Sequence, residues 1–219
     1  MLRALFEKTG TAVWISHLDL LRLFQRAFAR ANLPLKHTQG FNPRPSVSIA
    51  LPLSVGMESV CELLDFEVTQ ASDGCGIAEK LNTGMPTGIR VLDCYEAKRP
   101  IRELDSLQAD VTLEYDAGIP DGAETALAAL FARDEILVEK RSKKGGMVDV
   151  DLRPLLRSLT IRKVSPQELT LDVVASAQNP GMNPQLLVAA IARHLPELRP
   201  DFACIRRIEI FDEQMEVFR

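Results

Sequence analysis

The most constraining feature of the sequence is a helical repeat of apolar residues that begins at residue 20. The repeat has the spacing i, i+3, i+4, i+7, i+8 and i+11, and consists of Leu20, Leu23, Phe24, Ala27, Phe28 and Ala31. This spacing places every member on one face of an α-helix. Ser16 can cap the helix start, with Asp19 three residues further on, and Pro34 ends it. The sequence therefore predicts an amphipathic helix over residues 17–31 that packs on a sheet.

Apolar residues that alternate with polar ones predict strands on both sides of this helix. In the first half, the expected strands lie near residues 2–6, 47–53, 64–68 and 89–94, with a short helix around residues 77–81. In the second half, they lie near residues 111–115, 136–138, 169–175 and 202–211, with helices near residues 123–131 and 185–195. Both halves follow the order β-α-β-β-α-β. The predicted fold is α+β, with two tandem ferredoxin-like (split βαβ) units built on antiparallel sheets.

A polar, charged stretch without periodicity separates the two halves. It runs from residue 97 to about residue 106, and we interpret it as a linker between residues 1–97 and residues 107–219. The chain has 219 residues, of which 46% are apolar, enough for one large core or two modest ones. No apolar run approaches the length of a membrane span, and the N-terminus lacks the pattern of a signal peptide. We expect a cytoplasmic protein.

The four cysteines exclude two kinds of metal site. Cys61, Cys75, Cys94 and Cys204 are far apart, whereas zinc knuckles and iron–sulfur clusters use closely spaced thiolates. We expect all four to be reduced and buried, and we expect no metal and no cofactor in the chain. The sequence also contains no nucleotide-binding glycine pattern, nucleophile elbow or HExxH sequence.

Positive charge is concentrated in two segments of a protein whose net charge is −4. Residues 20–57 carry five Lys or Arg and no acidic residue, and residues 139–163 carry eight basic and three acidic residues. Arg22, Arg26 and Arg30 are four residues apart, so a helix would align them on one face. Such a stripe favours a phosphate-rich partner. The expected nucleic-acid-binding residues are Arg22, Arg26, Arg30, Lys36, His37, Phe41, Arg44, Lys143 and Lys144.

Two histidines offer an alternative to a pure binding role. His17 precedes the basic segment and His37 lies within it, and the two could act as general acid and base in RNA cleavage without a metal. The stacking aromatics that read bases in common sheet-based RNA-binding modules are missing from the expected strands, so phosphate contacts would dominate. This second hypothesis resembles the tandem ferredoxin-like nucleases that process CRISPR repeats.

The sequence resembles, over essentially the whole chain, the radical SAM-linked family of uncharacterised bacterial proteins, a domain of unknown function (DUF2344), with its sharpest motifs in residues 10–60. The residues that carry the resemblance are Ser16-His17-Leu18-Asp19-Leu20, Arg22, Arg26-Ala27, Leu33-Pro34, Gly40-Phe41-Asn42-Pro43-Arg44-Pro45, Ser48, Ala50-Leu51-Pro52-Leu53 and Gly56. The resemblance implies RNA- or translation-related work beside a radical SAM enzyme, and it brings no established catalytic residue. This chain lacks the CxxxCxxC thiolates of such an enzyme, so radical chemistry would belong to the partner.

These observations lead to one main hypothesis and two alternatives. The main hypothesis is a non-catalytic accessory protein that binds an RNA or a ribosomal component and presents it to a radical SAM enzyme. The first alternative is the metal-independent endoribonuclease, with His17 or His37 as the acid or base. The second is a protein–protein adaptor whose arginines bind an acidic surface of the radical SAM enzyme.

Overall fold

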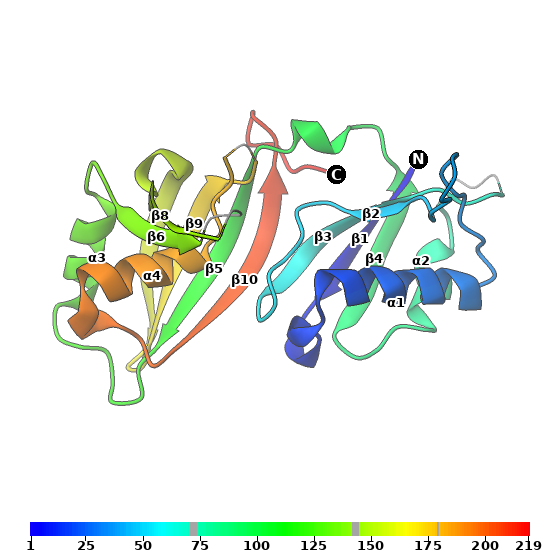
Figure 1. Cartoon of the computed structure of the whole chain (residues 1–219). Coiled ribbons are helices and arrows are strands. Elements are labelled where there is room, and N and C mark those ends of the chain that lie inside the picture. The colour runs from blue at the N-terminus through cyan, green and yellow to red at the C-terminus, as the bar shows by residue number, and fades with distance from the viewer. Residues whose placement is uncertain (71–73, 142–144, 179) are drawn as a thin grey trace. The chain divides into compact units, whose positions relative to one another are not determined.

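The computed structural model of the chain describes residues 1–70, 74–141, 145–178 and 180–219. Its strands and helices form a mixed α+β structure in which the strand pairs within each unit are antiparallel (Figure 1). The chain divides into two compact units, one of residues 1–103 with Arg219 and one of residues 104–218. None of the helices in the described ranges has both the length and the apolar character needed to span a bilayer.

The first unit is a four-stranded antiparallel sheet with two helices. Along the chain its elements are β1 (Leu2–Lys8), α1 (His17–Arg30), β2 (Val47–Ile49), β3 (Glu58–Phe66), α2 (Ile77–Asn82) and β4 (Ile89–Glu96). The strand order is β4-β1-β3-β2, with Leu2 of β1 opposite Phe66 of β3 and Glu96 of β4. A 3₁₀ turn at Gly10–Trp14 connects β1 to α1.

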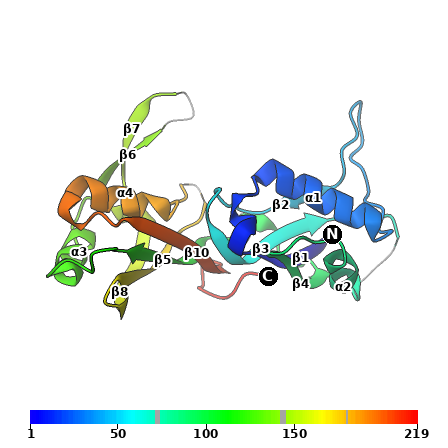
Figure 2. The ribbon, with the colours of Figure 1, turned by 90° about the horizontal axis from the view of Figure 1, so that it is seen from below.

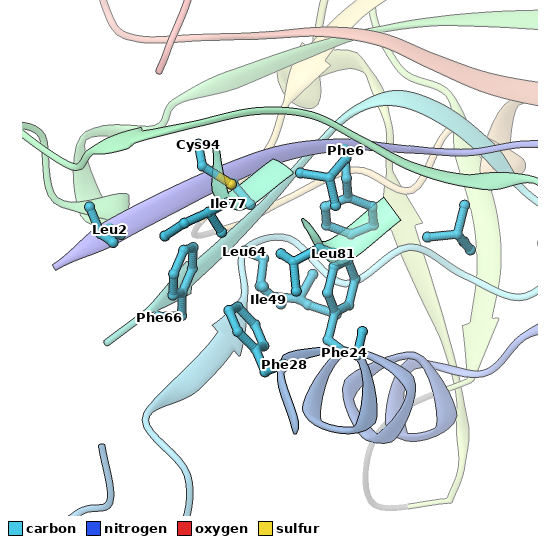
Figure 3. Close-up of a cluster of buried hydrophobic side chains, with 14 of the residues drawn as sticks. Leu2, Phe6, Phe24, Phe28, Ile49, Leu64, Phe66, Ile77, Leu81 and Cys94 are labelled. Atoms are coloured by element: carbon cyan, nitrogen blue, oxygen red, sulfur yellow. The ribbon is translucent and has the colours of Figure 1, made fainter. Parts of the chain in front are cut away.

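Both helices of this unit pack on one face of its sheet (Figure 3). Alternation along β1 turns Leu2, Ala4 and Phe6 toward the helices, and all three are buried. The rings of Phe6 and Phe24 lie 4.8 Å apart in an edge-to-face contact. Each fully buried side chain of this size stabilises the fold by about 1.5–3 kcal/mol. The apolar stripe predicted from the sequence is therefore the surface that fixes α1 to the sheet.

The strand expected over residues 47–53 is shorter than the alternation indicated. It ends at Ile49, because the chain turns at Leu51, whose φ is +45°. A left-handed backbone cannot continue a strand. The next strand, β3, begins at residue 58 instead of residue 64, since the polar residues at its start still pair with β1.

The second unit has the same order of sheet strands, with a hairpin inserted. Its elements are β5 (Ser106–Glu114), α3 (Ala123–Phe131), β6 (Leu137–Arg141), β7 (Met147–Asp151), β8 (Leu156–Ser165), β9 (Glu168–Ser176), α4 (Gln185–His194) and β10 (Phe202–Phe211). The sheet order within this unit is β10-β5-β9-β8. Helices α3 and α4 cover the face to which β5 and β9 turn buried residues such as Val111 and Leu171.

The strand predicted at residues 136–138 is not a member of this sheet. It begins β6, which pairs with β7 in a separate two-stranded hairpin that projects from the unit (Figure 2). The sheet position expected for it is occupied by β8, which the sequence analysis did not predict. The outward side chains of β8 include Arg162 and Lys163, and these charges weaken the alternating apolar pattern of an edge strand.

Candidate functional site

The basic helix of the first unit forms as its sequence predicts. The Ser16 hydroxyl accepts a hydrogen bond from the Asp19 backbone N–H at 3.2 Å, which caps the first turn. Leu20, Phe24 and Phe28 are buried against the sheet. Because this apolar face fixes the rotation of the helix, the face that carries the arginines must point away from the core.

The three arginines of α1 lie together in one surface groove. Arg22, Arg26 and Arg30 line it, and all three are exposed. Residues 84–86, from the connection between α2 and β4, form the opposite wall. Arg30 Nη1 donates a hydrogen bond to the Gly84 carbonyl at 3.2 Å, which ties the two walls together. The groove holds about 550 Å³ and is open to solvent.

The charge in this groove is only partly neutralised. Asp19 Oδ1 accepts a hydrogen bond from Arg22 Nη1 at 3.0 Å, and both side chains are more than half exposed. Hydrogen bonds from the Ser16 hydroxyl and from Arg22 lower the pKa of Asp19. Of the residues the structure describes, none places a carboxylate within 4.0 Å of the guanidinium of Arg26 or Arg30. Two cations are therefore available to an anionic ligand.

Lys36, His37, Phe41 and Arg44 lie outside this groove, in the exposed segment between α1 and β2. Figure 2 shows this segment beyond the end of α1, on the side away from α2. His37 forms an isolated β-bridge with Pro45, and Thr38 N–H donates to the Arg44 carbonyl at 2.8 Å. The Phe41 ring is fully exposed. None of the four residues lines the groove that holds the three arginines.

Two acidic residues from outside residues 20–57 neutralise part of this basic segment. Asp19 neutralises Arg22, and Glu67, from outside the segment, binds Lys36 Nζ at 3.1 Å. The hydrogen bond and charge of Lys36 lower the pKa of Glu67. Glu67 directly follows β3, whose last strand residue, Phe66, pairs with Val47. Only the fold brings that carboxylate to Lys36.

The two histidines of the nuclease hypothesis are far apart in the first unit. His17 opens α1, whereas His37 follows its other end (Figure 1). With 14 residues and a rise of 1.5 Å per residue, α1 is about 20 Å long. Neither imidazole lines the arginine groove. The geometry therefore does not place them as an acid–base pair around one scissile bond.

The remaining residues named from the sequence are two lysines and the four cysteines. Lys143 and Lys144 lie outside the described residues. Cys61 and Cys94 are buried as expected, but Cys75 is exposed and Cys204 is half-buried. Burial raises the pKa of the Cys94 thiol to about 12, which leaves it protonated and unreactive at neutral pH. Across the described ranges no group of three or more His, Cys, Asp or Glu is placed to hold a metal ion.

The groove wall at residues 84–86 was missed by the sequence analysis. For this region the sequence analysis predicted only the short helix around residues 77–81. The contact of Gly84 with Arg30 joins positions 54 residues apart, and no local pattern encodes it. A Cβ at residue 84 would lie 3.6 Å from the Arg30 side chain, an ordinary van der Waals distance, so this contact does not require a glycine.

A family model matches most of the chain. The model, described as "Uncharacterized protein conserved in bacteria (DUF2344)", matches residues 1–184. The chain belongs to this family. The match contains both α1 and residues 84–86, so the DUF2344 region holds the complete arginine groove. No curated protein matches the sequence.

Several solved structures resemble this DUF2344 protein in fold. A chain of "Crystal Structure of a Cbf5-Nop10-Gar1 Complex" matches 96% of it with a TM-score of 0.52 and 8% identity. A chain of "Structure of H/ACA RNP bound to a substrate RNA containing 2'-deoxyuridine" matches 94% of it, with a TM-score of 0.47 and 8% identity. The protein spans 50% and 46% of these two chains, about half their length. At such identities the first likeness describes the fold alone.

Proposed function

We propose that this DUF2344 protein binds RNA through the groove between α1 and residues 84–86. The observation that carries the proposal is that Arg22, Arg26 and Arg30 line one groove while two of them lack a carboxylate partner. Guanidinium groups bind phosphate with planar, bidentate hydrogen bonds. Three of them along one helix, about 6 Å apart along its axis, offer contacts to successive phosphates of a polynucleotide.

The proposal predicts binding that depends little on base sequence. Among the residues that the structure describes, no aromatic one lines the groove, and the exposed Phe41 lies in the segment between α1 and β2. Stacking and base-edge contacts are the main sources of sequence readout in single-stranded RNA. Phosphate contacts position a ligand without reading its sequence. We infer that selection of an RNA target would depend on its shape or on a second protein.

The cellular role that we propose for the protein follows from its resemblance to the radical SAM-linked family. The protein would act in the cytoplasm as a non-catalytic accessory of a radical SAM enzyme and hold an RNA or a ribosomal component for it. Each unit would be a ferredoxin-like module. The antiparallel orders β4-β1-β3-β2 and β10-β5-β9-β8, with both helices of each unit on one sheet face, support that classification.

The test is RNA binding by matched charge variants, measured by fluorescence anisotropy with a labelled RNA hairpin and an unpaired RNA of the same composition. One variant combines Arg22→Ala, Arg26→Ala and Arg30→Ala. Its control combines Lys80→Ala, Lys98→Ala and Arg102→Ala, which removes the same charge from exposed positions of the same unit outside the groove. We expect only the groove variant to lose most of its affinity.

Two outcomes would reject RNA as the ligand. Equal losses in the two variants would mean that net charge, not the groove, attracts RNA. Binding of a radical SAM enzyme that survives ribonuclease treatment and needs the three arginines would assign the groove to an acidic protein surface instead. RNA cleavage that depends on His17 or His37 would replace the binding role with the nuclease role.

A further inference from the structure

A second groove lies in the other unit, between α3 and β8, and it goes beyond the proposed RNA site. It holds about 730 Å³. Ala128 and Phe131 of α3 form part of one wall with Ala132, which follows the helix, and the whole run 156–161 of β8 forms the other. Successive side chains of a strand point to opposite faces of the sheet. A groove lined by six consecutive strand residues must therefore run along the edge of the strand.

The groove edge of β8 carries unpaired backbone groups. In the sheet order β10-β5-β9-β8, this strand pairs with β9 on one side and, within the described residues, with no strand on the other. Such an edge presents a row of N–H and C=O groups that can pair with an added strand. Helix α3 lies beside it, so an added strand would contact both backbone and side chains.

The two faces of β8 differ in a way that defines the ligand. Over residues 159–162 of β8, half-buried and exposed residues alternate. Leu159 and Ile161 are half-buried, whereas Thr160 and Arg162 are exposed. A strand added to this edge would alternate in the same manner. Its side chains near Leu159 and Ile161 would be covered by α3 and should be apolar. Those near Thr160 and Arg162 would face solvent.

Positive charge along β8 favours acidic residues at the polar positions of the ligand. Arg153 and Arg157 line the groove, and Arg162 and Lys163 follow on β8. Asp105 forms an ion pair with Arg157, and Asp110 Oδ2 lies 4.0 Å from Arg162 Nη2, whose side chain stays 60% exposed. Arg153 Nη1 donates to the Leu156 carbonyl at 3.2 Å. Glu124 adds one negative charge on the α3 wall. A second copy of β8 would bring like charges together, which is unfavourable across paired strands.

We propose that the α3–β8 groove binds an extended segment of a partner protein in which apolar residues alternate with acidic ones. The segment adds to β8 as a fifth strand of the β10-β5-β9-β8 sheet. Main-chain hydrogen bonds to the strand edge supply affinity, and the alternating side chains supply specificity. The segment's acidic residues lie on the solvent-facing side of the strand, beside Thr160 and Arg162.

The test uses the full chain and a fluorescein-labelled synthetic peptide of alternating valine and glutamate, with binding measured by anisotropy. Ala128→Trp fills the groove from an exposed helix position. Ala129→Trp is the matched control, because Ala129 is also exposed but does not line the groove. We expect Ala128→Trp to weaken binding about tenfold or more, the loss typical of a central interface position, and Ala129→Trp to leave it unchanged.

Methylated peptides test the backbone pairing itself. Two versions of the peptide carry N-methyl groups on alternate residues, in opposite phase. An added strand uses only every second N–H for pairing, so one version should lose binding and the other should retain it. Equal binding of both versions would overturn strand addition. Absence of saturable binding, or equal binding of a valine–lysine peptide, would overturn the proposed ligand, as would dimerisation that Ala128→Trp abolishes.

Discussion

Gly88 provides the sharpest test of how the groove wall of the first unit is held. It lies just before β4, has a φ of +89°, and accepts a hydrogen bond from Thr9 N–H at 2.8 Å. A Cβ at this position would collide with the Thr9 carbonyl oxygen and approach the Ala12 Cβ to 2.9 Å. Residues 84–86, the wall opposite the arginines, are separated from it by Thr87 alone. Gly88→Ala should therefore destabilise the first unit.

The magnitude follows from two separate terms. A left-handed conformation costs an L-residue about 1–2 kcal/mol, and forcing a methyl group into a packed site adds about 1–3 kcal/mol. The control is Gly76→Ala, because Gly76 has a φ of +71° but open space where its Cβ would lie. That variant should lose only the first term. The difference between the two variants then measures the collision with residues 9–12.

Urea unfolding followed by tryptophan fluorescence is the suitable assay. The single tryptophan, Trp14, lies in the 3₁₀ turn that contains Ala12, so its signal reports on the same segment. We expect Gly88→Ala to lower the free energy of unfolding by about 2–5 kcal/mol and Gly76→Ala by about 1–2 kcal/mol. Equal free energies of unfolding for the two variants would refute the packing of residues 9–12 against Gly88.

Three further predictions concern single side chains. Ser16→Ala should destabilise the first unit by about 1 kcal/mol in the same assay, because it removes the cap of α1, and Ser16→Asp should restore most of that loss. Burial raises the pKa of Tyr95 to about 12 and also raises that of Tyr115, so the folded chain should show little tyrosinate absorbance at pH 10. Stability should fall as pH rises above 10, where the unfolded chain releases these protons first. Iodoacetamide at neutral pH should label the exposed Cys75 and spare Cys94 until the chain is unfolded, and labelling of Cys94 in the folded state would contradict its burial.

Local sequence patterns were sufficient to predict those helices and strands that bury one face. The helix α1 was predicted within one residue of its observed end, because Ser16, the apolar stripe and Pro34 all specify the same segment. The alternating buried residues of β1, β5 and β9 likewise identified these strands. In each case one face of the element is buried, and burial imposes the period that the sequence displays.

Edges and long-range contacts could not be found in the same way. The edge strand β8 has exposed residues on much of its length, so no strict alternation marks it. The apolar Ile136 and Val138 gave a stronger strand pattern, although Val138 belongs to β6 of the inserted hairpin and Ile136 directly precedes that strand. Of the candidate site, the arginine face of α1 was predictable. Its partner wall at residues 84–86 and the neutralising Glu67 depend on contacts between distant segments.

The salt dependence of RNA binding tests the central claim most directly. Each phosphate contact contributes about 0.7 to the slope of log K against log salt concentration for single strands and about 0.9 for duplexes. If Arg22, Arg26 and Arg30 each contact one phosphate, replacing all three with alanine should reduce the slope by about 2–3. The control with Lys80, Lys98 and Arg102 replaced should keep the wild-type slope. An unchanged slope in the groove variant would contradict the assignment of the groove to an RNA backbone.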